Sequence, residues 1–108
     1  MFVMIKLTQI SGYSEETYRQ TFGSKKPIIL IGAGPRPVME YDAESNRPTG
    51  KIIAQKIDVY YKGLGVQEVK LPKDFTSSSM KDMSEVELIS PEACIVNRNV
   101  YVRAKGVQ

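Results

Sequence analysis

Tyr60 and Tyr101 are the residues of this chain whose type and surroundings point most directly to chemistry. Each lies in a segment where apolar and polar residues alternate, and each is spaced two or four residues from cations. The cations that share a strand face with these rings are Lys56, Lys62, Arg103 and Lys105. Cations neutralise phosphates, and an exposed ring can stack on an unpaired base at about 1–3 kcal/mol per base. This pattern therefore predicts contact with single-stranded nucleic acid.

The alternation assigns a face to each of these side chains. In residues 51–62, one face carries the apolar residues Ile53, Ile57, Val59 and Tyr61 together with Gln55, and only that face is apolar enough to be core. In the last strand, Val100, Val102 and Ala104 are expected to point inward. Tyr60 and Tyr101 should then face outward. The alternative is that these lysines and tyrosines are ordinary solvent-exposed residues of the sheet, where lysines at the edges also deter aggregation.

Two further cations lie in or next to a turn-rich segment, residues 42–50. Arg47 is within this segment and Lys51 directly follows it. Long hairpin loops close over the binding strands of small β-barrels, so both side chains are candidate phosphate contacts. It is an equal alternative that both side chains are loop charges that only keep the protein soluble. The expected nucleic-acid-binding set is Tyr60, Tyr101, Lys56, Lys62, Arg103, Lys105, Arg47 and Lys51.

The residue inventory argues against catalysis and against bound cofactors. The chain has no histidine and a single cysteine, Cys94, which reads as a small buried apolar residue. The pair Glu85 and Glu87 has no partner base. The glycine turn in residues 31–37 lacks the third glycine and the helix of a dinucleotide site, so a bend is expected there. We expect no enzyme activity, no cofactor and no metal.

Length and composition fit one small globular domain. The chain has 108 residues, of which 42% are hydrophobic and 25% charged, with a net charge of +3. No apolar run approaches the roughly 18 residues of a membrane span, and Lys6 interrupts the apolar start. One cysteine fits a reducing compartment. We therefore expect a cytoplasmic protein that has no membrane partner.

The expected elements are mainly strands. Residues 1–10 read as a strand, and Ser14 should cap a helix that Gly23 ends. Strands are expected over residues 27–31, 38–41, 51–62, 66–71, 85–89 and 93–104, the last with a break at 97–99. Residues 74–83 are the expected site of a short connecting helix.

This order predicts a five-stranded OB-type barrel with one short connecting helix and an N-terminal strand and helix extension. Residues 1–26 would form an N-terminal arm and residues 27–108 the barrel domain. Another half-open β-barrel, or an α+β sheet, would have the same element order.

The segment 37–107 resembles a family of small conserved proteins. The resemblance lies in V-M-E-Y-D-A-E-S-N-R-P-T-G-K, in the long strand and hairpin, and in E-V-E-L-I-S-P-E-A followed by the final strand. Residues 86–91 are its most specific part. Such proteins are encoded in transfer regions of Gram-positive conjugative transposons and plasmids. They are similar to OB-fold single-stranded DNA-binding proteins, akin in size to those of filamentous phages.

The resemblance implies a sequence-tolerant protein of a mobile element or phage that coats single-stranded DNA, or RNA by the same chemistry, during transfer or replication. One small domain can bind only a few nucleotides, so covering a strand needs several copies in a row, which favours self-association. Residues 1–10 could pair with the open sheet edge of a neighbour. The alternative is a non-catalytic module that binds another protein of a conjugative element.

Overall fold

A capped helix comes first in the part of the chain that the computed structural model describes, residues 12–32 and 34–108. Helix α1 spans Glu15–Phe22, and the Ser14 hydroxyl accepts a hydrogen bond from the Thr17 amide, as expected of an N-cap. Gly23 ends the helix with a positive φ of 64°. Both ends of α1 are therefore as predicted. With eight residues, α1 is too short to cross a membrane, and no other described residues form a membrane-spanning helix.

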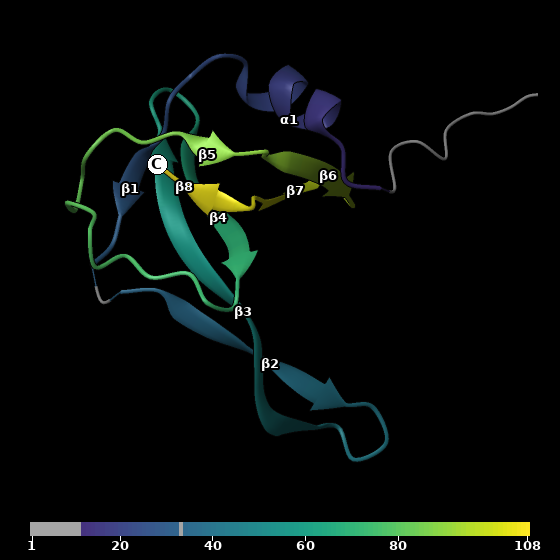
Figure 1. Cartoon of the computed structure of the whole chain (residues 1–108). Coiled ribbons are helices and arrows are strands. Elements are labelled where there is room, and N and C mark those ends of the chain that lie inside the picture. Colours follow the sequence, from purple (N-terminus) through teal and green to yellow (C-terminus); the bar gives the residue numbers. More distant parts are fainter. Residues whose placement is uncertain (1–11, 33) are drawn as a thin grey trace, which may run out of the picture.

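In the described part of the chain, eight strands follow the helix (Figure 1). They are β1 (Ile28–Leu30), β2 (Arg36–Asp42), β3 (Arg47–Tyr61), β4 (Gly65–Pro72), β5 (Leu88–Ile89), β6 (Glu92–Val96), β7 (Asn99–Arg103) and β8 (Gly106–Val107). The main sheet has the order β1-β3-β4-β7-β6, and β2 also pairs with β3. All these pairs are antiparallel except β4 with β7, which is parallel. Strands β5 and β8 form a separate pair.

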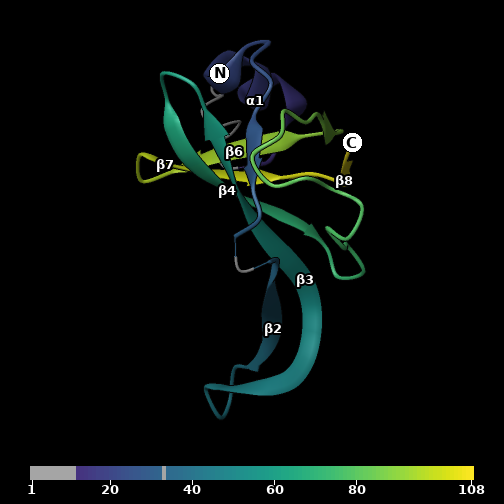
Figure 2. The same ribbon diagram turned by 90° about the vertical axis from the view of Figure 1, so that its left-hand side faces the viewer.

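The long strand β3 organises the sheet. Its last residues pair with β1 and its earlier residues pair with β2, so both short strands lie along the same edge of β3. The chain bends between β1 and β2, where Gly32 and Gly34 adopt φ values of 48° and 92° that other residues rarely take. The glycines thus make the bend that the sequence predicts. Figure 2 shows how strongly β3 curves along its length.

The mainly β class is confirmed, but two features of the predicted fold are not found. Within the described residues the sheet is open, because β2 pairs only with β3 and the strand order ends at β6. The connecting helix predicted for residues 74–83 is wrong, since this segment consists of turns. The Thr76 hydroxyl accepts a hydrogen bond from the Ser78 amide, a local contact that competes with a helix. The strand predicted for residues 1–10 lies outside the described part.

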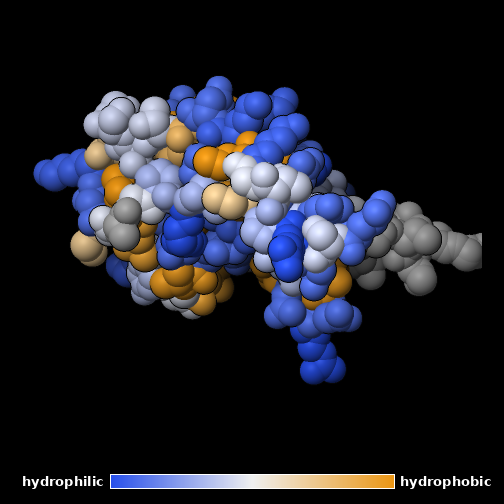
Figure 3. Space-filling model, turned by 90° about the horizontal axis from the view of Figure 1, so that it is seen from below, coloured by the Kyte–Doolittle hydropathy of each residue, from blue (hydrophilic) through white to orange (hydrophobic). Residues whose placement is uncertain are grey.

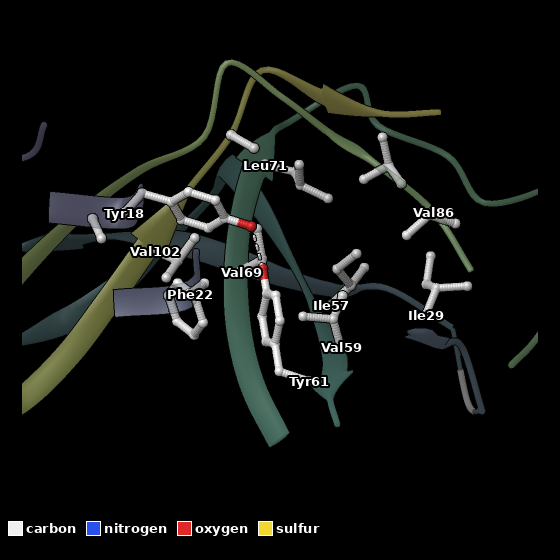
Figure 4. Close-up of a cluster of buried hydrophobic side chains, with 13 residues drawn as sticks. Tyr18, Phe22, Ile29, Ile57, Val59, Tyr61, Val69, Leu71, Val86 and Val102 are labelled. Atoms are coloured by element: carbon white, nitrogen blue, oxygen red, sulfur yellow. Dashed lines mark hydrogen bonds between the residues drawn. The ribbon is translucent and has the colours of Figure 1, made fainter. Parts of the chain in front are cut away.

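One face of the sheet, here called the core face, carries the buried side chains. Ile57, Val59 and Tyr61 of β3 alternate inward and are at most 2% exposed. Helix α1 packs Tyr18 and Phe22 against Tyr61, and the Phe22 ring stacks on that of Tyr61 at 4.2 Å between centroids (Figure 4). The described residues of the segment 1–26, which the sequence predicts as a separate N-terminal extension, therefore contribute to the same core as the strands.

The hydroxyls of Tyr18 and Tyr61 bind one another inside this core (Figure 4). Burial raises the pKa of both phenols above the ordinary value of 10.0. Stability linked to these groups is therefore complete below about pH 10 and is lost as the pH rises further, because the unfolded phenols ionise first.

Replacing either tyrosine of this pair by phenylalanine should lower the free energy of unfolding. Tyr61→Phe leaves the buried Tyr18 hydroxyl without its partner, which costs about 1–3 kcal/mol. In the double variant with Tyr18→Phe, no hydroxyl is left unpaired, so its loss should be smaller than the sum of the single losses. Urea unfolding at pH 7 measures all three. Additive losses would contradict a direct bond.

The β2–β3 ribbon extends beyond the rest of the sheet as an arm (Figure 1). The predicted loop 42–50 is shorter than expected, because β3 already begins at Arg47. The register shifts between Val38 and Met39, which pair with Ala54 and Ile52. This bulge leaves Ile53 43% exposed while Ala54 is buried, so the prediction of Ile53 as core was wrong.

Candidate nucleic-acid interface

The face of the sheet opposite the core face, here called the outer face, carries the predicted ring and cation pattern. Lys56, Asp58 and Tyr60 alternate with the buried residues of β3, and Tyr101 and Arg103 alternate with buried Val102 in β7. Tyr60 is 37% and Tyr101 47% exposed. Their predicted outward orientation is therefore confirmed.

The two rings lie on the same face but are not adjacent. Tyr60 pairs with Val66 of β4, whereas the pairing of Val69 with Val102 places Tyr101 level with Glu68. Strand β4 thus separates the rings by two strand spacings, about 10 Å, and by a step of two residues along the sheet. A single base could not contact both rings, but neighbouring bases on one strand could.

Two hollows that share the lining residues Tyr13 and Lys70 adjoin one another along the junction of β4 and β7, and together they are here called the groove. The first, of about 280 Å³, is also lined by Lys56, Glu68 and Tyr101. The second, of about 260 Å³, reaches Arg103 and Lys105 at the other end. The groove therefore brings together four of the eight predicted site residues, and its lining holds two tyrosines and four cations.

Tyr13 is a groove residue that sequence reasoning missed. The guanidinium of Arg103 lies over its ring, 4.1 Å from the centroid, which is cation–π geometry. Burial and the neighbouring thiol of Cys94 raise the pKa of the Tyr13 phenol. Cys94 itself is buried, as predicted. Tyr13 precedes α1 outside any strand pattern, so no sequence signal could have placed it on this face.

Lys70 was also missed, although the alternation could have found it. It lies between the buried residues Val69 and Leu71 of β4 and must therefore point to the outer face. In the parallel pair β4–β7, Lys70 lies next to Arg103. The signal is the alternation of Val69, Lys70 and Leu71 within the strand predicted over residues 66–71.

A cluster of ion pairs occupies the outer face beside the groove. Arg36 of β2 donates hydrogen bonds to Asp58 and to Glu68, each with a shortest N–O distance of 3.0 Å. The Lys56 Nζ lies 3.1 Å from the other oxygen of Glu68. Burial raises the pKa of Glu68, but the bonds from Lys56 and Arg36 outweigh it and hold that pKa below its usual value. The bonds to these carboxylates raise the pKa of Arg36.

These pairs make the outer face mixed in charge rather than uniformly positive. Lys56 is bound to Glu68, and Arg103 is bound to Glu92 at 2.8 Å. Lys70 and Lys105 form no ion pair with any described residue. Within the groove, these two ammonium groups are the cations not already engaged by a carboxylate.

The other predicted residues lie outside the groove lining. Tyr60 is on the outer face near the end of β3, and Lys62 is exposed in the turn that follows. Arg47 and Lys51 lie on the arm, at the start of β3. The structure therefore divides the predicted set into a groove group and two outlying pairs.

The carboxylates of this face are arranged for ion pairing. Asp58 and Glu68 both bind Arg36, and no group of three metal-ligating side chains occurs among residues 12–32 and 34–108. Glu92 binds Arg103.

Comparisons with protein-family models, with curated proteins and with solved structures find no match to this chain.

Proposed function

We propose that the protein binds single-stranded DNA, or RNA of the same form, along the groove of the outer face. The observation that carries the proposal is the lining itself, where the rings of Tyr13 and Tyr101 lie among four cations. Bases would stack on Tyr101 while phosphates contact Lys70, Lys105 and the neighbouring cations. A helix that could enter the groove of a duplex is not present on this face in the described part of the chain.

The strand order supports an OB-type fold, opened on one side. Strands β1 and β2 lie along the same edge of β3 and together form the first of three antiparallel segments, and β3 and β4 are the second and third. The hairpin β6–β7 follows in the chain, and β7 joins β4. In OB folds the face of the second and third strands, with the loops beside it, binds oligonucleotides. Here those strands are β3 and β4, which carry Lys56 and Lys70. This correspondence with the ligand-binding face of OB folds supports the proposed site.

The proposed role is that of a cytoplasmic protein of a mobile element or phage, which covers single strands during transfer or replication. This part of the proposal is supported by the resemblance of residues 37–107. Tyr60 and Lys62 would extend the track along β3, and Arg47 and Lys51 would reach it from the arm.

Self-association through the N-terminal segment remains part of the proposal. Ser14 and Ala93 exchange two backbone hydrogen bonds of 3.0 Å, which attaches the start of the described chain to the outer edge of β6. The residues that precede Ser14 therefore begin at a sheet edge where a strand could be added.

Fluorescence anisotropy with labelled oligothymidine tests the central claim. We expect saturable binding of the single strand and at least tenfold weaker binding of a duplex of the same length. Equal affinity for the two forms would contradict the proposed groove.

Removing the carboxylate of Glu68 should strengthen binding. Glu68→Gln releases Lys56 and Arg36 and removes a charge that repels phosphate, at a distance where one such interaction is worth about 1 kcal/mol. We expect the Kd for oligothymidine at low salt to fall about fivefold. Glu16→Gln, which makes the same change on an exposed residue of α1, should leave the Kd unaltered. A weaker complex for Glu68→Gln would place the site elsewhere.

A further inference from the structure

The guanidinium group of Arg103 is held in place by two neighbours beside the groove. Its Cζ atom lies over the Tyr13 ring, 4.1 Å from the ring centroid. Its Nε donates a hydrogen bond of 2.8 Å to a carboxylate oxygen of Glu92. Tyr13 therefore supports one face of the group, and Glu92 fixes one edge.

The rest of this group is open to a ligand. The Arg103 side chain is 51% exposed, and it lines the second hollow of the groove together with Lys70 and Lys105. Among the described residues, Glu92 is the only ion-pair partner of Arg103. The second face of the guanidinium and its two Nη groups are thus left for contacts with a ligand.

This arrangement suits a base better than a phosphate. The carboxylate of Glu92 offsets the positive charge of Arg103, whereas Lys70 and Lys105 have no such partner among the described residues. An arginine plane is weakly hydrated, and bases stack on it as they do on aromatic side chains. Because Tyr13 and Glu92 already fix the plane, little side-chain entropy would be lost when a base binds.

Arg103 also lies next to Tyr101 in the series of outward side chains of β7. Only the buried Val102 separates the two residues, so their side chains leave the outer face about 7 Å apart. Neighbouring bases of one single strand could therefore stack on Tyr101 and on Arg103.

Individual flat side chains matter on this protein because its apolar surface is divided. Figure 3, which views the molecule from the end of the arm, shows hydrophilic side chains between separate apolar patches. In the groove, the exposed ring of Tyr101 likewise shares its hollow with Lys56 and Lys70. Bases would therefore be held by single rings and planes, of which the Arg103 guanidinium is one.

We infer that Arg103 is a second base-stacking platform of the groove, and that Tyr13 is the support of this platform. The inference rests on the proposed function, since it assigns a role to Arg103 within the same groove. It differs from the sequence prediction, which expects Arg103 to contact phosphate. The charge of Arg103 still attracts nearby phosphates, because stacking uses a face of the guanidinium and leaves the Nη groups free.

Arg103→Lys tests the inference, because it retains the charge and removes the plane. We expect the Kd for oligothymidine at low salt to rise about fivefold or more, while the slope of log Kd against log salt stays that of wild type. Arg98→Lys is the matched control, because it makes the same exchange on an exposed residue of the turn between β6 and β7. Its Kd should equal that of wild type. Circular dichroism shows whether each variant is folded.

An abasic oligomer of the same length provides the second measurement, since it carries the phosphates without the bases. Wild type and Arg103→Lys should bind this oligomer with Kd values within about twofold of one another. Equal oligothymidine affinities of Arg103→Lys and wild type, or an equal loss with the abasic oligomer, would overturn the inference and leave the groove in place. A wild type that binds no oligothymidine would overturn the proposed function and the inference with it.

Discussion

Tyr101→Ala should weaken the binding of oligothymidine by between about fivefold and 150-fold. This range corresponds to the 1–3 kcal/mol that one base gains by stacking on an aromatic ring. Tyr101 is suited to this role because it is 47% exposed and lines the groove together with Lys56 and Lys70. Anisotropy titrations at one salt concentration measure the change in Kd.

Two companion variants identify stacking as the cause. Tyr101→Phe keeps the ring and should bind within about twofold of wild type. Tyr60→Ala removes a ring from the same face but outside the groove lining, so its effect should be smaller than that of Tyr101→Ala. If Tyr60→Ala has the larger effect, the single strand follows the β3 side of the sheet and the groove is not its path.

Alternation along single strands was enough to predict both the core and the outward rings. Val59 and Tyr61 are buried and Tyr60 is exposed, because a strand packed on one face must alternate. The capped helix was equally predictable, since Ser14 and Gly23 act on their own neighbouring backbone. These features depend on interactions that are local in sequence.

Features that depend on contacts between distant segments could not be predicted in this way. The bulge that exposes Ile53 arises from the register between β2 and β3, and no residue type marks it. The turns of residues 74–83 replace the expected helix because the segment packs Phe75 and Met80 against the core from separate turns. Arg36 neutralises Asp58 although 22 residues separate them.

This last contact changes how the net charge of the chain should be interpreted. An excess of three cations over the whole sequence suggests a positive surface, yet on the outer face carboxylates hold Arg36, Lys56 and Arg103 in ion pairs. Affinity of the groove for a polyanion then depends on Lys70 and Lys105, its two cations without an ion pair to any described residue, and on the exchange of the paired cations from carboxylate to phosphate. Binding of this kind is driven by the release of counterions and must therefore respond to salt.

Raising the salt concentration from 50 to 200 mM should weaken oligothymidine binding about 50-fold. Four groove cations, Lys56, Lys70, Arg103 and Lys105, give a slope of about −2.8 in log K against log salt, at about −0.7 per phosphate contact with a single strand. Lys70→Ala removes one contact, so its slope should fall to about −2.1. Anisotropy titrations at four or more salt concentrations measure both slopes.

The size of the slope change separates a groove contact from a general loss of charge. Lys81→Ala removes the same charge from an exposed lysine that lines neither hollow, so its slope should equal that of wild type. The slopes of Arg47→Ala and Lys51→Ala show in the same way whether the cations of the arm contact phosphates. If Lys70→Ala and Lys81→Ala have equal slopes, the phosphates do not follow the groove, and the charges of the outer face serve only to hold β2, β3 and β4 together.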